Sequence, residues 1–454
     1  MSHSSPPDAP APLAACDVAI VGAGAAGLAA MRALEERGIR TCVLEARDRI
    51  GGRIYTLRDP RLAHPIELGA EFVHGSAPEL LEIGRQARLL LYAVEGERWR
   101  SRAGRLSRLE DFWDQLQTIT EHLDARKADQ SFEDFLRDAP GGRRAAEARA
   151  MARAFVEGFH AAAAHLISTK ALADGGIPSD EEEQRQLRVA DGYDRVPEWL
   201  AGNLGDRIAI NAAVERIEWH PGAIELLVRK SNGGSATVNA RAAIITVPLG
   251  VLLATGSGEG VIAFAPRPPV LDRIRECLTM GSVIRVSILF RDRWWTERRR
   301  GDSLESMSFL HGDSGDVRVW WSLHPAQLPV MVGWAGGPAA SRLGGRSAEE
   351  IGDLALGALA RNFGIPRRRV SSQVEAFWTH DWQGDPFSRG AYSYALVGGA
   401  ESAAELARPI RSTLWFAGEA ADPEGRNGTV HGAIGSGRRA AQSVARVLER
   451  AKSQ

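Results

Sequence analysis

The stretch VAIVGAGAAGLAAMRALEERGIRTCVLE, residues 18–45, decides the fold. Its parts are, in order, an apolar run (18–21), a glycine-rich turn (22–27), a helix-favouring segment that overlaps this turn (25–37) and a second strand-like run (41–44). Gly38 follows the helical segment, and glycine is the usual residue just past a helix end. A strand, a turn, a helix and a strand within about 30 residues predict a βαβ unit.

The glycine turn has the spacing of a dinucleotide-binding fingerprint. Gly22 permits the tight turn, Gly24 lets the backbone approach a pyrophosphate, and Gly27 allows the helix to pack closely on the strand. Ala26 lies in the same turn, where the start of the helix offers N–H groups to phosphate oxygens. Glu45 follows Gly27 by 18 residues, at the end of the second strand, and is expected to accept hydrogen bonds from the ribose hydroxyls.

A second glycine pair follows at once. Arg47 precedes the run Ile50-Gly51-Gly52-Arg53-Ile54. Two glycines beside an arginine suit a further backbone approach to the pyrophosphate at Gly52, with Arg53 supplying charge-assisted hydrogen bonds.

Composition narrows the class of protein. The 454 residues carry 57 acidic and 56 basic side chains, a net charge of −1, so neither a nucleic acid nor an anionic membrane is expected as partner. Three cysteines without a CxxC pair support neither a disulfide framework nor a metal site. The N-terminus lacks the pattern of a secretory signal, and no apolar run of about 18 residues occurs. We expect a soluble, cytoplasmic protein.

Longer motifs carry a resemblance to a known family. Residues 43–53, VLEARDRIGGR, resemble the second signature of the flavin amine oxidases, which include monoamine oxidases, polyamine oxidases, L-amino-acid oxidases and lysine-specific histone demethylases. Further similar segments follow in family order: 67–75, 191–193, 245–250, 378–394 and 415–441. The sequence TVHGA at 429–433 is most similar to polyamine oxidases and the histone demethylases. A chromatin role is disfavoured, because no long helical insertion interrupts the chain.

The resemblance implies an α/β fold. It consists of a Rossmann-type, GR2-like FAD-binding domain built from discontinuous segments, with an inserted α+β substrate-binding domain. We predict a disordered N-terminus (1–13), an FAD-binding domain (14–77, 187–250 and 405–454), a helical part of the substrate domain (78–186) and a mixed sheet and helix part (251–404). The alternating run 282–290 predicts a strand in the last of these.

The cofactor implied by the resemblance is FAD. The residues expected beside it, in addition to those of the two glycine motifs, are Gly69, Ala70, Glu71, Phe72, Val214, Gly418, Glu419, Thr429 and Val430. Monoamine oxidases carry a cysteine that links to the flavin where this chain has Ala391, so the FAD is expected to be non-covalent. Gly432, Gly435 and Gly437 are poor helix formers, which suggests that the last helix approaches the cofactor closely.

Four residues are expected at the substrate. The resemblance places Trp382 and Tyr392 as aromatic walls of the cavity. Glu71 aligns with a pocket residue of some polyamine oxidases and suits a cationic substrate; alternatively, its side chain points away from the pocket. Arg285 falls where the family usually has a lysine near flavin N5 and keeps the charge without giving up its proton; a slip in the alignment would make it a surface arginine.

The implied reaction is oxidation of a small-molecule amine, with a polyamine or another primary or secondary amine favoured. A hydride passes from the α-carbon to flavin N5, the imine hydrolyses, and dioxygen reoxidises the flavin to yield hydrogen peroxide. Two alternatives stay open. One is an L-amino-acid oxidase, for which Arg285 is a candidate to bind the substrate carboxylate. The other is a flavin-binding protein without turnover, which the arginine in place of lysine would suit.

Overall fold

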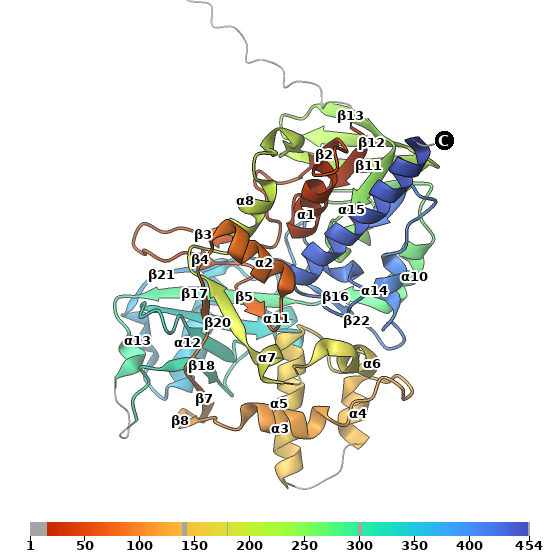
Figure 1. Cartoon of the computed structure of the whole chain (residues 1–454). Coiled ribbons are helices and arrows are strands. Elements are labelled where there is room, and N and C mark those ends of the chain that lie inside the picture. The colour runs from red at the N-terminus through yellow and green to blue at the C-terminus, as the bar shows by residue number, and fades with distance from the viewer. Residues whose placement is uncertain (1–15, 139–142, 179, 298–301, 453–454) are drawn as a thin grey trace, which may run out of the picture.

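The computed structural model describes residues 16–138, 143–178, 180–297 and 302–452. The predicted disordered N-terminus, residues 1–13, lies outside the described residues. Figure 1 shows α1 (Ala25–Glu35) and the C-terminal helix α15 (Val430–Lys452) side by side at the upper end of the molecule. The helices α3 (Phe112–Thr120) and α5 (Arg143–Phe159) lie at its lower end.

The predicted βαβ unit lies at the centre of a five-stranded parallel sheet. Its strands, in spatial order, are β10 (Ile208–Ala209), β2 (Thr41–Leu44), β1 (Val18–Val21), β14 (Ala242–Ile245) and β23 (Leu414–Phe416). They come from widely separated parts of the chain, so the α/β fold built from discontinuous segments is confirmed. Four of the five are fully buried, which explains why their sequences are continuously apolar instead of alternating.

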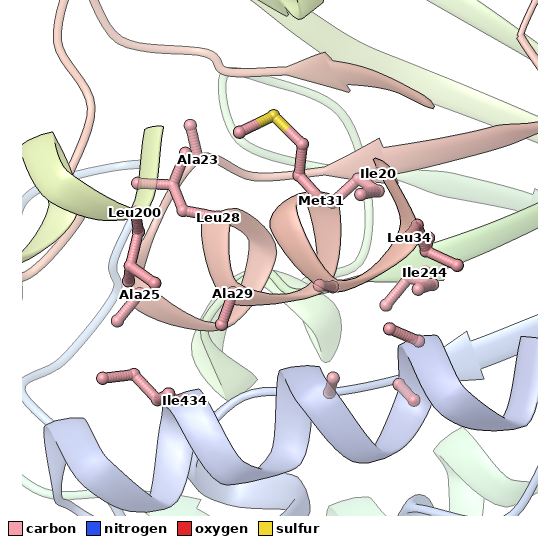
Figure 2. Close-up of a cluster of buried hydrophobic side chains, with 14 of the residues drawn as sticks. Ile20, Ala23, Ala25, Leu28, Ala29, Met31, Leu34, Leu200, Ile244 and Ile434 are labelled. Carbon is pink, nitrogen blue, oxygen red and sulfur yellow. The ribbon is translucent and has the colours of Figure 1, made fainter. Parts of the chain in front are cut away.

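One face of this sheet is covered by α1 and α15. Figure 2 shows Ala25 and Ala29 of α1 opposite Ile434 of α15 in the core between them. A Cβ atom at Gly437 would lie 2.1 Å from the carbonyl oxygen of Ala26. Small residues therefore allow the two helices to approach closely.

The expectation that the three glycines of the last helix face the cofactor is wrong. Gly437 packs against α1, and a Cβ atom at Gly432 or Gly435 would meet the backbone or the guanidinium of Arg426 at 2.4 and 2.6 Å. Helix packing and the half-buried Arg426 account for these glycines.

The other face is covered by a four-stranded sheet. Its order is β13 (Ser235–Ala240), β12 (Ala223–Lys230), β11 (Ala212–His220) and β15 (Ala263–Ala265). Ile217 and Leu226 pack from it against Val21 of the parallel sheet. The strand β13 is absent from the sequence prediction, because its sequence SATVNA has a single large apolar residue.

A seven-stranded sheet forms the centre of the substrate domain. Its order is β21 (Val374–Thr379), β17 (Val283–Phe290), β20 (Val330–Gly336), β19 (Val319–Ser322), β18 (Met307–His311), β7 (Glu97–Arg102) and β8 (Arg105–Arg108). The strand β17 confirms the prediction for 282–290. Helix α12 (Ala348–Asn362) packs on one face of the sheet, where Ile284 and Ala355 share a core. The opposite face borders the cavity described below.

Residues 78–186 are less helical than predicted. Helices α3 and α5 lie in this segment, but so do β6 (Leu91–Ala93), β7 and β8. In β7, Trp99 and Ser101 are buried while Arg98 and Arg100 are on the other face, so the chain alternates with the period of a strand. Arginines at the alternate positions hide that period from a hydrophobicity pattern. No helix in the described part of the chain is long and apolar enough to cross a membrane.

Candidate active site

A cavity of about 1000 Å³ lies where the parallel sheet meets the seven-stranded sheet. It opens at the carboxyl ends of β1 and β2, where ligands bind in α/β folds of this type. Of the predicted site residues, all except Gly27 line it: Gly22, Gly24, Ala26, Glu45, Arg47, Gly52, Arg53, Gly69, Ala70, Glu71, Phe72, Val214, Arg285, Trp382, Tyr392, Gly418, Glu419, Thr429 and Val430.

The glycine turn combines tight packing with an open side. A Cβ atom at Gly27 would lie 1.9 Å from the carbonyl oxygen of Gly22, so helix α1 can sit on β1 only with glycine there. By contrast, a Cβ atom at Gly24 would meet nothing within 4 Å. Gly24 is also the N-terminal cap residue of α1, and no side chain caps that helix. The N–H groups at its start therefore face the cavity as an anion-binding site.

Glu45 is held against this turn. Its carboxylate accepts hydrogen bonds from the backbone N–H of Ala23 at 2.7 Å and of Arg47 at 2.9 Å. Burial raises the pKa of Glu45, and these hydrogen bonds act in the opposite direction. A buried acid at the end of β2, an open glycine and an uncapped helix start together fit the ribose and pyrophosphate of a dinucleotide.

The two arginines after β2 are tied to other parts of the chain. Arg47 donates to Asp385 and Ser388, both at 2.9 Å, and so anchors the loop that follows Trp382. Arg53 donates to Glu419 at 2.8 Å and keeps a quarter of its side chain exposed. A phosphate contact by Arg53 stays a prediction. The guanidinium of Arg47 donates to protein side chains, Asp385 and Ser388.

Glu419 connects three segments of the cavity wall. Besides Arg53, its carboxylate accepts hydrogen bonds from the hydroxyl of Ser393 at 2.7 Å and the N–H of Gly428 at 2.9 Å. Burial alone would raise the pKa of Glu419, but Arg53 and these hydrogen bonds outweigh it and lower the pKa. Nearby, the Thr429 hydroxyl accepts from Gly432 N–H at 3.0 Å and thereby caps α15.

Aromatic side chains form the other walls. The Trp382 indole donates to the carbonyl of Leu68 at 3.0 Å, which holds its ring beside Gly69. The Tyr392 hydroxyl donates to the carbonyl of Phe159 at 2.6 Å, so the ring is fixed against the end of α5. Both hydroxyl and indole N–H are satisfied by protein, and the rings present apolar surface to the cavity.

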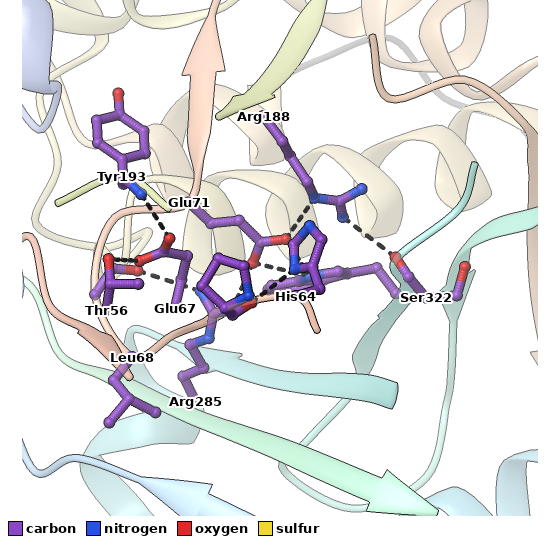
Figure 3. Close-up of polar contacts among 12 residues, drawn as sticks. Thr56, His64, Glu67, Leu68, Glu71, Arg188, Tyr193, Arg285 and Ser322 are labelled. Carbon is purple, nitrogen blue, oxygen red and sulfur yellow. Dashed lines mark hydrogen bonds and ion pairs between the residues drawn. The ribbon is translucent and has the colours of Figure 1, made fainter. Parts of the chain in front are cut away.

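Glu71 lies between two arginines (Figure 3). One carboxylate oxygen accepts from Arg188 Nε at 2.6 Å and the other from Arg285 Nη2 at 2.6 Å. The indole N–H of Trp321 is within 3.2 Å of both oxygens. Burial alone would raise the pKa of Glu71, but the two guanidinium groups hold it below its ordinary value. We call Arg188, Glu71 and Arg285 the triad; its net charge is +1.

The triad decides two questions that the sequence leaves open. Arg285 is only 3% exposed and lines the cavity, so it is not a surface arginine. Both oxygens of Glu71 accept hydrogen bonds from protein donors, and two guanidinium groups neutralise its charge, so it does not attract a cationic substrate. Glu71 is therefore a residue that positions Arg285, and its suggested role in amine recognition is wrong.

Glu67 lies beside the triad, on the strand β4 (Ile66–Glu67). It accepts hydrogen bonds from the Thr56 hydroxyl at 2.6 Å and the N–H of Tyr193 at 2.8 Å. Burial raises the pKa of Glu67 to about 7, and the hydrogen bonds and the charge of Arg285 oppose this shift only in part.

Sequence reasoning missed Arg188, Trp321 and Glu67. Arg188 and Glu71 are 117 positions apart in the chain and meet because β9 (Gln186–Val189) pairs with β5 (Phe72–His74). A buried arginine in an apolar strand, as in Gln186-Leu187-Arg188-Val189, is the one local signal that points to such a site.

Comparisons with known proteins agree with a dinucleotide-binding cavity of this kind. The family model for flavin containing amine oxidoreductases matches residues 25–445. Polyamine oxidase 2 of Arabidopsis thaliana is 29% identical over 483 residues, which cover 95% of this chain and 89% of that protein. A lysine-specific histone demethylase 1 homolog of Oryza sativa is 28% identical over 98% of this chain, but the chain spans only 59% of its length.

Solved structures share the fold. Wild-type putrescine oxidase bound to putrescine superimposes with a TM-score of 0.78 at 24% identity, covering 96% of this chain and 100% of that one. Cyclohexylamine oxidase from Brevibacterium oxydans gives a TM-score of 0.78 at 22% identity, covering 96% and 100%.

Proposed function

This chain belongs to the flavin-containing amine oxidoreductases, and we propose that it is an FAD-dependent amine oxidase. One observation carries the proposal. The dinucleotide turn at Gly24, the aromatic walls at Trp382 and Tyr392, and the buried cation Arg285 all line the same cavity. A cofactor held at the turn and an amine held between the walls would therefore share one enclosed space.

The protein side chains have separate tasks. When bound, the flavin supplies the acceptor for a hydride from the carbon that bears the amine. Trp382 and Tyr392 hold the apolar part of the amine and exclude water from it. Arg285 contributes a fixed positive charge, oriented by Glu71, that favours negative charge developing nearby. The imine product then hydrolyses in water.

The identity of the electron acceptor is a further part of the proposal. Dioxygen is the acceptor and hydrogen peroxide its product. The FAD is held without a covalent bond, since Ala391, where monoamine oxidases have a cysteine, lines the cavity and has no reactive side chain. A cytoplasmic location is proposed from the sequence alone.

The amine substrate is a polyamine or another primary or secondary amine. Polyamine oxidases are among the similar proteins, which supports an amine substrate. However, the acid that suggested a polycation, Glu71, is neutralised by Arg188 and Arg285. An L-amino-acid oxidase is also disfavoured, because the guanidinium of Arg285 donates to Glu71 and to the carbonyl of Gly69 at 3.2 Å.

The test is anaerobic mixing of purified yellow holoenzyme with a panel of monoamines, diamines and amino acids. Bleaching of the visible flavin band by amines is expected, and the rate should rise with pH as the substrate ammonium loses its proton. Admission of air should restore the band and release hydrogen peroxide. Absence of bleaching by every amine across neutral and alkaline pH would contradict the proposal and favour a non-catalytic flavoprotein.

A further inference from the structure

Arg98 lines the cavity on β7. It belongs to β7, where it pairs with Phe309 of β18, and Phe309 pairs in turn with Trp321 of β19. These three side chains lie on the sheet face that lines the cavity. Four strand steps separate β17, which carries Arg285, from β7, or about 19 Å at the usual strand spacing.

The charge of Arg98 has no carboxylate partner in the described part of the chain. Its guanidinium lies over the rings of Phe309, Phe112 and Trp113, at 4.6, 5.2 and 5.3 Å from their centroids. Burial is what lowers the pKa of Arg98, to about 10, so the group stays charged at neutral pH. The other deeply placed arginines of the cavity differ: Arg285 pairs with Glu71, and Arg53 with Glu419.

His311 provides a second polar group beside Arg98. Its ring stacks on Phe112, with centroids 4.9 Å apart and planes 24° from parallel. Burial and then the charge of Arg98 lower the pKa of His311 to about 3, so the imidazole is neutral. Its Nε2 atom is buried and has no hydrogen-bond partner among the described residues.

An aromatic path joins this site to the reacting end. The Tyr392 hydroxyl holds the backbone of Phe159, whose ring stacks on Phe155 with centroids 5.0 Å apart. Phe155 contacts Phe112, with centroids 6.2 Å apart, and Phe112 stacks on His311. All of these residues line the cavity. The path is apolar along its length and ends at a cation.

We propose that Arg98 and His311 bind a carboxylate on the far end of the amine substrate. This inference rests on the proposed function and names its substrate class: a molecule with an amine and a carboxylate at opposite ends of a mostly apolar chain. A half-buried cation that faces aromatic rings gains from an anionic partner, and a carboxylate supplies a singly charged, planar partner that accepts from guanidinium. The amine end then reaches Trp382 and Tyr392.

The same charge disfavours a diamine in this position. A distal ammonium would meet Arg98 with like charge. One acid that could hold such a group is Glu157 on α5, which lines the cavity. Burial raises the pKa of Glu157, while Arg153 and Arg318 oppose the rise. If the cavity were specific for diamines, oxidation of a diamine would depend on Glu157 and not on Arg98.

The experiment measures how fast the holoenzyme oxidises three substrates of equal chain length: octylamine, ω-aminooctanoate and diaminooctane. The wild type should oxidise ω-aminooctanoate with the highest kcat/KM, roughly 10- to 100-fold above octylamine, as a charge-assisted hydrogen bond predicts. Arg98→Gln should lower kcat/KM for ω-aminooctanoate to about that for octylamine, whereas Arg98→Lys should keep part of the preference. Arg108→Gln, which removes an exposed arginine of the neighbouring strand β8, is the matched control and should behave as wild type.

Binding of octanoate, which has no amine, separates this inference from the proposed function. Calorimetry should show that octanoate binds the wild type and Arg108→Gln, and binds Arg98→Gln at least about tenfold more weakly. That result supports the carboxylate site even if no amine is oxidised. Oxidation of amines with equal kcat/KM for octylamine and ω-aminooctanoate would overturn it, as would a preference for diaminooctane that is lost in Glu157→Gln.

Discussion

The Nη2 atom of Arg285 lies 2.6 Å from Oε2 of Glu71, and each of the two side chains is 4% exposed. Arg188 approaches the other oxygen of Glu71 at the same distance. A single carboxylate thus faces two buried guanidinium groups, and the site keeps one net positive charge. The carboxylate of Glu71 holds the guanidinium fork of Arg285 in one orientation.

Glu71→Gln should destabilise the protein strongly. The substitution leaves Arg188 and Arg285 buried without a counter-charge, and breaking a buried ion pair in this way costs about 3–5 kcal/mol. The free energy of unfolding from urea titration measures the effect. Glu82→Gln, which breaks a half-exposed pair with Arg438, should cost less than about 1 kcal/mol. Equal stability of the two variants would show that the triad does not depend on the charge of Glu71.

Replacement of Arg285 tests the charge near the cofactor. Arg285→Gln should slow reaction of the reduced holoenzyme with dioxygen by about tenfold or more, since it removes a preorganised positive group. Arg285→Lys should react at least as fast as the wild type, because lysine keeps the charge and can also transfer a proton. Stopped-flow mixing with oxygenated buffer gives these rates. Reoxidation of Arg285→Gln at the wild-type rate would show that Arg285 does not contribute to the reaction with dioxygen.

The fold could be predicted from residues 18–45 because the sequence pattern there is local. Strand, turn, helix and strand follow one another directly, and each glycine meets a requirement set by its neighbours. The strands β14 and β23, which extend the parallel sheet, are continuous apolar runs, so they can also be recognised as strands from the sequence. The hydrophobicity pattern does not reveal the strand β7, because its arginines alternate with Trp99 and Ser101. The strand that carries Arg98 therefore falls in the segment predicted to be helical.

The site could be predicted as a set of residues but not as a network. Motif positions identified Glu71 and Arg285, yet these are 214 positions apart, and Arg188 comes from a third segment. Which polar groups pair depends on how the sheet that contains β5 and β9 meets the sheet that contains β17, and no local pattern records that. The role predicted for Glu71 was wrong for this reason. A carboxylate in a pocket suggests a cationic substrate, but the cations that pair with Glu71 are Arg188 and Arg285 of the protein itself.

Two glycines of the turn should respond differently to alanine. Gly27→Ala places a Cβ atom 1.9 Å from the carbonyl oxygen of Gly22, so it should lower the stability of the whole protein by several kcal/mol, about the cost of overpacking a core. Gly24→Ala has open space and an extended backbone, so the apoprotein should unfold near the wild-type midpoint. The new methyl group occupies the side from which a pyrophosphate would approach, and FAD affinity should fall.

Fluorescence titration of apoprotein with FAD, together with urea unfolding, distinguishes the two effects. Gly205→Ala, at another glycine with open space around it, is the control for both measurements. If Gly24→Ala binds FAD as the wild type does, the cofactor does not approach the turn at this residue.

Glu67 should make stability depend on pH. Its pKa is raised from its ordinary value of 4.5 to about 7 in the folded protein. Below about pH 4 both folded and unfolded states hold the proton. Between the two pKa values the unfolded state loses the proton first, so the folded state binds more protons and stability falls as pH rises. Above about pH 8 the loss is complete and amounts to about 3 kcal/mol, from 1.36 kcal/mol per pKa unit.

Glu67→Gln removes this titration while keeping an oxygen that can accept from the N–H of Tyr193. The wild type should therefore lose stability relative to Glu67→Gln between about pH 5 and about pH 8, and the two unfolding free energies should converge in acid. Urea unfolding at a series of pH values measures the difference. Glu349→Gln, at an exposed position on α12, should run parallel to the wild type. Parallel curves for Glu67→Gln would mean that the carboxyl is ionised in the folded protein and that Arg285, not burial, controls its charge.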